Sequence, residues 1–153
     1  MAEKRFSKQV KIKNNKARYE FELMDEFTAG IQLQGTEIKS IREGKANLNE
    51  AFVSLLSQEV FVRNMFIDEY KEGTYANHIP KRDRKLLLNK REIKKIQKHM
   101  LIKGYTAIPT LLFINENGLA KLKFSLAKGK KLHDKRDSLK QKDLKRQIDR
   151  ALS

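Results

Sequence analysis

Residues that could perform acid–base or nucleophilic chemistry are sparse in this chain. Its one cluster of acids consists of Glu20, Glu22, Asp25 and Glu26. Glu20 and Glu22 alternate with apolar residues, which places them on the polar face of a predicted strand, and carboxylates on such a face are usually solvated rather than catalytic. A metal-dependent nuclease that uses Asp25 and Glu26 stays open as a minor hypothesis.

The remaining chemistry-bearing residues form no recognisable catalytic or metal-binding motif. The chain has no cysteine, and its three histidines, His78, His99 and His133, lack the short spacings of a zinc site. His133 and Asp134 could imitate a general base with its orienting acid, but no nucleophile motif accompanies them. Gly129 stands alone, so no glycine-rich phosphate loop is present. We therefore expect neither an enzyme nor a bound metal or cofactor.

The charge of the chain indicates a polyanionic partner. Its 153 residues carry a formal net charge of +15, with a pI near 10.0, which favours nucleic acid first and an anionic membrane surface second. No apolar run approaches the roughly 20 residues of a membrane-spanning helix, and the basic N-terminus lacks the apolar core of a secretory signal. We expect a cytoplasmic protein of one domain with no membrane partner.

Cations recur on three predicted elements, and aromatic residues accompany them. The cations are Lys39, Arg42 and Lys45 on a helix, Lys81 to Lys85 in a loop, and Lys121, Lys123, Lys128, Lys130 and Lys131 on the last strand and its exit. The aromatic residues are Tyr19, Tyr70, Tyr75 and Phe113. They could stack on bases, although the strand position of Phe113 favours a place in the core. The pattern predicts RNA binding through the phosphate backbone, with strong salt dependence.

The hydrophobic periodicity predicts a small β-barrel. Period-2 alternation predicts strands at 19–23 and 31–34, with Gly30 and Gly35 bracketing the second; further strands are expected at 52–56, 60–63, 106–114 and 119–127. Thr36 is predicted to cap a short helix that ends before Gly44, and Asn89 with Glu92 to begin a second that ends at Gly104. We predict a mainly β fold, a six-stranded antiparallel barrel resembling an oligonucleotide-binding (OB) fold, with two to three flanking helices.

The two ends of the chain differ from its middle in composition. Residues 1–13 form a basic arm, residues 14–128 the folded RNA-binding body, and residues 129–153 a charged tail. The tail keeps only a thin apolar stripe at helical spacing, which predicts a segment that is disordered when free and helical when bound.

Four blocks of the sequence carry a resemblance to a known family. They are Gly30–Arg42, Gly44–Asn47, Arg82–Leu88 and Ala127–Arg136. In this order and spacing they closely resemble the SmpB family of bacterial tmRNA-binding proteins. Thr28 and Ile79 replace acids that many members carry, and the aromatic that some members have at Thr36 is absent.

The resemblance implies an OB-fold barrel that holds the tRNA-like domain of tmRNA and delivers it to the vacant A site of a stalled ribosome for trans-translation. Implied contacts to tmRNA fall on Asn14, Arg18, Glu37, Lys39, Arg42, Asn47, Lys121 and Lys128. Implied contacts to the decoding centre of the small subunit, next to the mRNA channel, fall on Gly129, Lys131, His133, Asp134, Lys135 and Arg136. Elongation factor Tu on aminoacylated tmRNA is a further implied partner, and we expect a monomer. A basic ribosomal or ribosome-assembly protein that binds structured rRNA is the alternative.

Glu37 has three possible roles on this basic surface. Its carboxylate could accept hydrogen bonds from base amino groups or orient Lys39 and Arg42. It could also be an ordinary acid in the first turn of a helix, where the helix dipole favours negative charge. The sequence leaves the three open.

Overall fold

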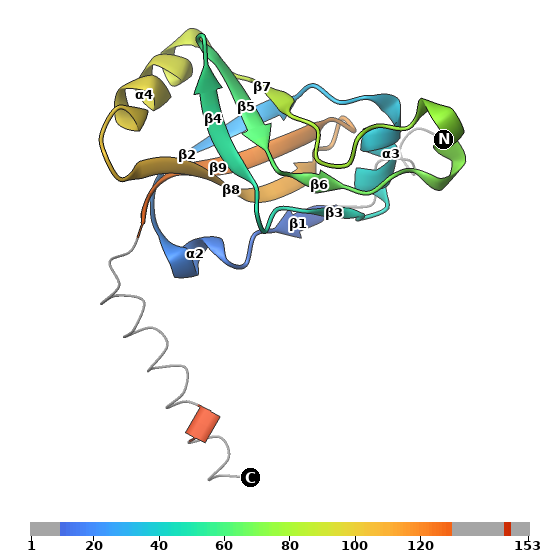
Figure 1. Cartoon of the computed structure of the whole chain (residues 1–153), viewed down its shortest axis with the longest axis horizontal. Coiled ribbons are helices and arrows are strands. Elements are labelled where there is room, and N and C mark those ends of the chain that lie inside the picture. The colour runs from blue at the N-terminus through green and yellow to red at the C-terminus, as the bar shows by residue number, and fades with distance from the viewer. Residues whose placement is uncertain (1–9, 130–145, 148–153) are drawn as a thin grey trace.

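The structure, a computed structural model, describes residues 10–129 and 146–147. The elements are, in chain order, β1 (Lys11–Lys13), α2 (Ala17–Glu20), β2 (Phe21–Ile31), α3 (Gly35–Arg42), β3 (Ala46–Asn47), β4 (Phe52–Leu56), β5 (Glu59–Arg63), β6 (Phe66–Ile67), the 3₁₀ helix η1 (Lys71–Ala76), β7 (Arg84–Leu87), α4 (Lys90–Met100), β8 (Tyr105–Ile114) and β9 (Ala120–Gly129). Strands predominate, which confirms the predicted mainly β class (Figure 1).

Six strands close into an antiparallel barrel. Neighbours follow the order β8-β4-β5-β7-β2-β9, and β9 pairs again with β8 to complete the ring. Closure removes the open edges that would otherwise invite pairing with other chains. β1 adds to β8 outside the ring, and β3 pairs with β6 in a separate small sheet. The predicted six-stranded barrel is therefore confirmed.

The barrel interior is filled by alternate residues of its strands. On β9, Leu122, Phe124 and Leu126 are fully buried, and the Phe124 ring stacks on Phe27 of β2 with centroids 5.5 Å apart. Helix α4 contributes Ile96, which is also completely buried in this core. Burial of these apolar side chains is the main force that holds strands and helix together.

The N-terminal strands differ from the prediction. In place of the two strands expected at 19–23 and 31–34 there is a single long strand, β2. Tyr19 lies in the short helix α2 before it, and residues 32–34 follow it outside any strand. β2 bulges between Leu23 and Glu26 and changes partner at Gly30, which pairs with Lys121 of β9 and also with Leu87 of β7. Gly30 therefore continues the strand, and β7 is the sixth member of the barrel.

Of the other predicted helix ends, Gly44 and Asn89 are confirmed, whereas α4 ends at Met100, before the predicted stop at Gly104. Helix α3 ends as expected at Gly44, whose φ of 75° is typical of a glycine helix stop, although its N-cap is Gln34 rather than Thr36. The hairpin β4–β5 turns at Ser57 and Gln58 with positive φ values of 48° and 66°. Such values are typical of a type I′ turn, here formed without the usual Asn-Gly pair.

Helix α4 begins as the sequence predicts. The Asn89 side chain accepts a hydrogen bond from the Glu92 N–H at 2.9 Å, and the Glu92 carboxylate accepts one from the Asn89 N–H at 3.2 Å. This capping box satisfies amide groups that the first turn leaves without partners.

The folded part extends beyond both predicted bounds of the body, 14 and 128. β1 pairs with β8, and Gly129 pairs with Phe21 of β2. Residues 1–9 of the arm and 130–145 and 148–153 of the tail lie outside the described residues. Within the described part, no helix has the length and apolar composition needed to cross a membrane.

Candidate nucleic-acid interface

Helix α3 presents one buried and one exposed side. Glu37 and Ile41 are completely buried, whereas Lys39 is exposed and Arg42 is half-buried. The Glu37 carboxylate accepts a hydrogen bond from the Gln34 N–H at 2.8 Å, which fixes the first turn. The helix therefore exposes Lys39 beside a buried anchor and keeps Arg42 half-buried, with its Nε atom shielded from solvent.

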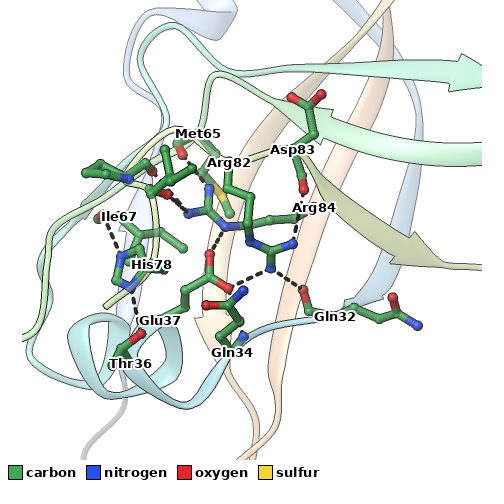
Figure 2. A network of polar contacts seen from close by, with 12 residues as sticks. Gln32, Gln34, Thr36, Glu37, Met65, Ile67, His78, Arg82, Asp83 and Arg84 are labelled. Atoms are coloured by element: carbon green, nitrogen blue, oxygen red, sulfur yellow. Dashed lines mark hydrogen bonds and ion pairs between the residues drawn. The ribbon is translucent and has the colours of Figure 1, made fainter. Parts of the chain in front are cut away.

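That anchor is a cluster of one acid and two arginines, in which Glu37 and Arg84 are completely buried and Arg82 is partly exposed (Figure 2). Arg82 Nη2 donates to Glu37 Oε1 at 2.7 Å, and Arg84 Nε donates to Glu37 Oε2. Arg84 is itself completely buried and donates further to the carbonyl oxygens of Met65 at 2.6 Å and Pro80 at 3.0 Å. Each buried charge thus has hydrogen-bonding partners, without which its desolvation would strongly destabilise the fold.

The position of Glu37 decides between the roles that the sequence left open. Its carboxylate is 0% exposed and faces Arg82 and Arg84, not Lys39 or a solvent-facing groove. The predicted direct contact of Glu37 with RNA therefore does not hold in this structure. Glu37 instead ties α3 to β7 and to the loop before it.

Burial and ion pairing act in opposite directions on the Glu37 carboxyl. Burial alone raises its pKa, but hydrogen bonds from Arg82, from the Gln34 N–H and from Arg84 outweigh that effect and hold the pKa below its ordinary value. Burial lowers the pKa of Arg84, and the Glu37 carboxylate opposes the change. The lowered pKa keeps the Glu37 carboxyl ionised at neutral pH.

We predict that the Glu37 cluster makes the fold sensitive to acid. Because the folded-state pKa of Glu37 is lowered, its stabilising contribution is complete above the ordinary carboxyl pKa of 4.5 and is lost as the pH falls from there through the folded-state pKa. Urea unfolding across this range should show a steeper loss of unfolding free energy in the native chain than in Glu37→Gln. Equal slopes for the two proteins would contradict the prediction.

His78 links the same loop to α3. It is 3% exposed, and its Nε2 lies 2.9 Å from the Ile67 carbonyl oxygen, which can only accept a hydrogen bond. Nε2 therefore carries a proton, and in the neutral ring Nδ1 accepts from the Thr36 hydroxyl at 2.8 Å. The histidine thus joins α3 to β6 (Figure 2).

The loop beside α3 also positions an exposed cation. The Asn77 side-chain oxygen accepts a hydrogen bond from the Tyr70 N–H at 2.9 Å, and its Nδ2 donates one to the Tyr70 carbonyl oxygen at 2.7 Å. These two bonds close the loop on itself. The Tyr70 ring in turn lies 5.5 Å from Lys39 Nζ, within cation–π distance. A Cβ at Gly73 would stand 2.9 Å from Thr36 Cγ2, so the loop packs closely on α3 and needs glycine there.

Asn14 and Arg18 lie at the corner between β1 and α2. Asn14 is 9% exposed, and its side-chain amide donates to the Pro109 carbonyl at 2.9 Å and the Leu48 carbonyl at 3.3 Å. Arg18 is exposed beside an open hollow of about 770 Å³ that Lys13 also lines. Asn14 therefore positions this corner against the segment after β3, while Arg18 and Lys13 face outward.

Asn47 lies on the neighbouring edge, in β3. It is exposed, and its side-chain oxygen accepts the Asn49 N–H at 2.7 Å. Because Asn14 contacts Leu48, the residue after Asn47, the structure brings the predicted contacts Asn14 and Asn47 close together.

Three lysines of β9 point away from the barrel interior. In the pairing of β9 with β2, Lys121 lies opposite Gly30 and Lys123 lies opposite Thr28. Lys123 Nζ lies 5.8 Å from the Phe113 ring, and Lys128 Nζ 6.0 Å from the Tyr105 ring. A lysine ammonium over an aromatic ring is held in place while still presented to solvent.

The aromatic side chains have mixed positions. Phe113 is half-buried beneath Lys123 on the outer side of the barrel and belongs to no buried core cluster of the described residues. The expectation that it is a core residue is therefore wrong. Tyr19 is half-buried, and the Tyr75 side chain lies outside the described part.

The N-terminal acids do not converge on one point. Asp25 pairs with Lys95 of α4 at 3.1 Å, and Glu26 pairs with Lys123 of β9 at 3.8 Å. In residues 10–129 and 146–147 no group of three or more potential metal ligands is found. These contacts give no support to the hypothesis of a nuclease that uses Asp25 and Glu26.

A protein-family model, related proteins and a solved structure all match this chain. The family model described as "SmpB protein" matches residues 11–153. The chain belongs to the SmpB family. An SsrA-binding protein of Bacteroides thetaiotaomicron is 57% identical over 92% of this chain and 94% of its own length, and one of Parabacteroides distasonis is 52% identical over 96% of each. A solved structure described as "tmRNA-SmpB: a journey to the center of the bacterial ribosome" contains a chain that matches with a TM-score of 0.71 and 37% identity, and the match covers 85% of this chain and 94% of that one.

Of the six predicted decoding-centre contacts, the structure describes one, Gly129. Gly129 is the last residue of β9 and is exposed. The other predicted decoding-centre contacts lie outside the described residues; they are Lys131, His133, Asp134, Lys135 and Arg136.

The predicted cationic loop at 81–85 is largely engaged within the SmpB fold. Arg84 is buried, Arg82 binds Glu37, Lys81 pairs with Glu50 at 3.8 Å, and Lys85 pairs with Glu59 at 3.4 Å. Strand periodicity could have found the buried arginine, because Arg84 shares its inward face with Leu86. The structural roles of Arg84 and His78, which are buried behind the surface, were not predicted. Lys123 was predicted as one of the cations of the last strand but is not among the implied tmRNA contacts.

Proposed function

We propose that this protein is the RNA-binding adaptor that binds the tRNA-like domain of tmRNA and carries it to stalled ribosomes for trans-translation. The observation that carries the proposal is family membership over nearly the whole chain, with relatives named SsrA-binding proteins. The body needs no catalytic group for this task, and we assign it none.

The RNA-binding surface in this proposal draws its cations from two groups. One is Lys39 and Arg42 of α3; the other is Arg18 of α2 with Lys121 and Lys128, which lie near the two ends of β9. Asn14 and Asn47 belong to the same proposed surface, and Asn14 ties the β1–α2 corner to the chain beside Asn47. Glu37 acts behind this surface by fixing α3 through Arg82 and Arg84.

The two groups suit a folded RNA. Arg18, Lys39 and Lys128 are exposed on helices and a strand, and Arg42 and Lys121 are half-buried. Folded RNA is recognised mainly by backbone shape, which cations on regular elements can follow. Neutralising phosphates releases condensed counterions and supplies affinity without reading sequence.

Further partners follow from the same proposal. The tail, with Gly129, Lys131, His133, Asp134, Lys135 and Arg136, meets the decoding centre and continues as a helix along the empty mRNA channel. Elongation factor Tu binds the same aminoacylated tmRNA. The protein acts in the cytoplasm, as a monomer, and its arm, body and tail have separate roles.

We predict that the variant Lys39→Gln/Lys121→Gln weakens binding to the isolated tRNA-like domain of tmRNA. If each lysine neutralises one phosphate, the slope of log affinity against log salt should become shallower by about 1.4 to 1.8. Fluorescence anisotropy over a salt series measures this slope.

A matched control is Lys81→Gln/Lys85→Gln, which removes the same charge from two lysines that are ion-paired within the protein. It should leave the slope near the native value. Tighter binding of the native chain to rRNA fragments than to the tRNA-like domain would instead favour a ribosomal or ribosome-assembly protein.

A further inference from the structure

Helix α4 carries cations that the proposed RNA surface does not use. Its inner side packs Ile96 into the barrel core, with Ile93 and Met100 beside it. Five cations are exposed on the helix, Lys90, Arg91, Lys94, Lys95 and Lys98. At 3.6 residues per turn they fall on the side opposite the three apolar residues. We call these five residues the α4 cationic face.

The spacing of these cations is unfavourable for the helix itself. Lys90 and Lys94, Arg91 and Lys95, and Lys94 and Lys98 are like charges four residues apart, where they repel. Lys90 and Arg91 also lie in the first turn, where the helix dipole disfavours positive charge.

The single acid of α4 does not relieve this repulsion. Glu92 turns its carboxylate back to the Asn89 N–H at 3.2 Å. A local arrangement that lowers stability without a gain inside the fold indicates a functional surface.

The remainder of the fold does not neutralise the face. Lys95 pairs with Asp25 of β2 at 3.1 Å. Among residues 10–129 and 146–147, no carboxylate lies within 4.0 Å of the side-chain nitrogens of Lys90, Arg91, Lys94 or Lys98. The face therefore presents concentrated positive charge to an external anion.

The way α4 packs argues against a membrane as that anion. A basic helix that binds a membrane surface must insert its apolar side among the lipids. In α4 that side is occupied by the barrel, and Ile96 is 0% exposed. A phosphate backbone needs only the cations, so RNA is the chemistry that fits.

The place of α4 in the fold indicates which RNA. Figure 1 places α4 at the far end of the barrel from α3, so the α4 cationic face is separate from the surface formed by Lys39 and Arg42. The His99 ring of α4 lies edge-on to the Tyr105 ring, with their centroids 6.4 Å apart, and Lys128 Nζ lies 6.0 Å from the centroid of the same Tyr105 ring. The last turn of α4 is thus beside the point where β9 ends at Gly129 and the tail begins.

We propose that the α4 cationic face binds the phosphate backbone of ribosomal RNA next to the site that the tail enters. The choice of ribosomal RNA rests on the proposed function, in which the tail meets the ribosome. Lys90 and Lys98 are separated by about 12 Å along the helix axis at 1.5 Å per residue, so the face touches several successive phosphates. The contact adds affinity and orientation and reads no sequence.

The test compares full-length variants in binding to purified ribosomes and to the isolated tRNA-like domain of tmRNA. Lys90→Gln/Lys94→Gln/Lys98→Gln removes one row of the face and retains good helix formers. We expect weaker ribosome binding, with a salt slope shallower by about 2 to 3 if each lysine meets one phosphate. Binding to the tRNA-like domain should not change, and Lys→Arg at the three positions should restore native ribosome binding.

A control variant separates the face from net charge. Arg63→Gln/Lys81→Gln/Lys85→Gln also lowers the formal charge from +15 to +12, by removing three cations that are ion-paired to acids of the fold. This variant should bind ribosomes like the native chain. An equal loss in both variants, or native ribosome binding by the α4 variant, would overturn the proposal.

Two further measurements test the assignment to RNA. If the α4 variant lost affinity for whole ribosomes but not for protein-free rRNA, the partner would be an acidic protein and the RNA proposal would be wrong. If it lost affinity only for phosphatidylserine vesicles, the partner would be a membrane. Failure of the native chain to bind the tRNA-like domain would instead contradict the proposed function, and the ribosome measurements would still decide the role of α4.

Discussion

Replacing Arg84 with methionine should lower the free energy of unfolding by roughly 3 kcal/mol or more, the range seen when one partner of a buried ion pair is removed. The change leaves the completely buried Glu37 carboxylate with Arg82 as its one remaining side-chain partner. It also removes donors from the carbonyl oxygens of Met65 and Pro80. Because small domains have only about 5 to 15 kcal/mol of stability, this loss should be plain in urea unfolding.

Two further variants show whether the buried charge is the cause. Glu37→Gln/Arg84→Met should recover part of the loss, since the uncompensated carboxylate is gone. Arg63→Met breaks the exposed pair with Asp83, whose side chains are about half exposed, and should change stability by less than about 1 kcal/mol. If Arg84→Met destabilised no more than Arg63→Met, the cluster would not be the anchor of α3.

Truncation after Gly129 should abolish tagging of nascent chains on stalled ribosomes while leaving affinity for the tRNA-like domain unchanged. In the proposed function the body holds tmRNA and the tail engages the decoding centre. The cut falls where β9 ends, so Gly129 keeps its pairing with Phe21 and Lys128 keeps its place beside Tyr105. Anisotropy with the tRNA-like domain and a reconstituted tagging assay measure the two activities.

Truncation after Ala127, which gives a shorter protein, is the matched comparison. It removes Lys128 and Gly129 as well, and therefore the last two register pairs between β2 and β9. Loss of tmRNA affinity should appear in this protein and not in the longer one. If truncation after Gly129 already abolished RNA binding, the division of roles between body and tail would be wrong.

Local sequence patterns were sufficient where a single element decides the outcome. Helix α4 follows from Asn89, Glu92 and its apolar spacing, and the β8–β9 hairpin follows from alternation around Asn117 and Gly118, because both depend on residues a few positions apart. The positive surface likewise follows from composition.

Patterns failed where partners are distant in sequence. Gly30 reads as a strand end, but its place opposite both Lys121 and Leu87 makes it part of one long strand. Which partner a strand acquires is decided by barrel closure, a tertiary event that alternation of side chains does not encode.

By itself, the sequence determined the class of this protein: a small β-barrel, a strongly basic surface and membership in the SmpB family. Only the tertiary structure decided which charged residues lie on the surface and which hold the fold. In the sequence, Glu37, Arg82 and Arg84 are as charged as Lys39 and Arg42 and give no sign of a different role. In the structure, Glu37 binds both arginines, which lie 45 and 47 residues away along the chain. Burial and pairing of charges depend on contacts between distant segments, and these exist only once the barrel has closed.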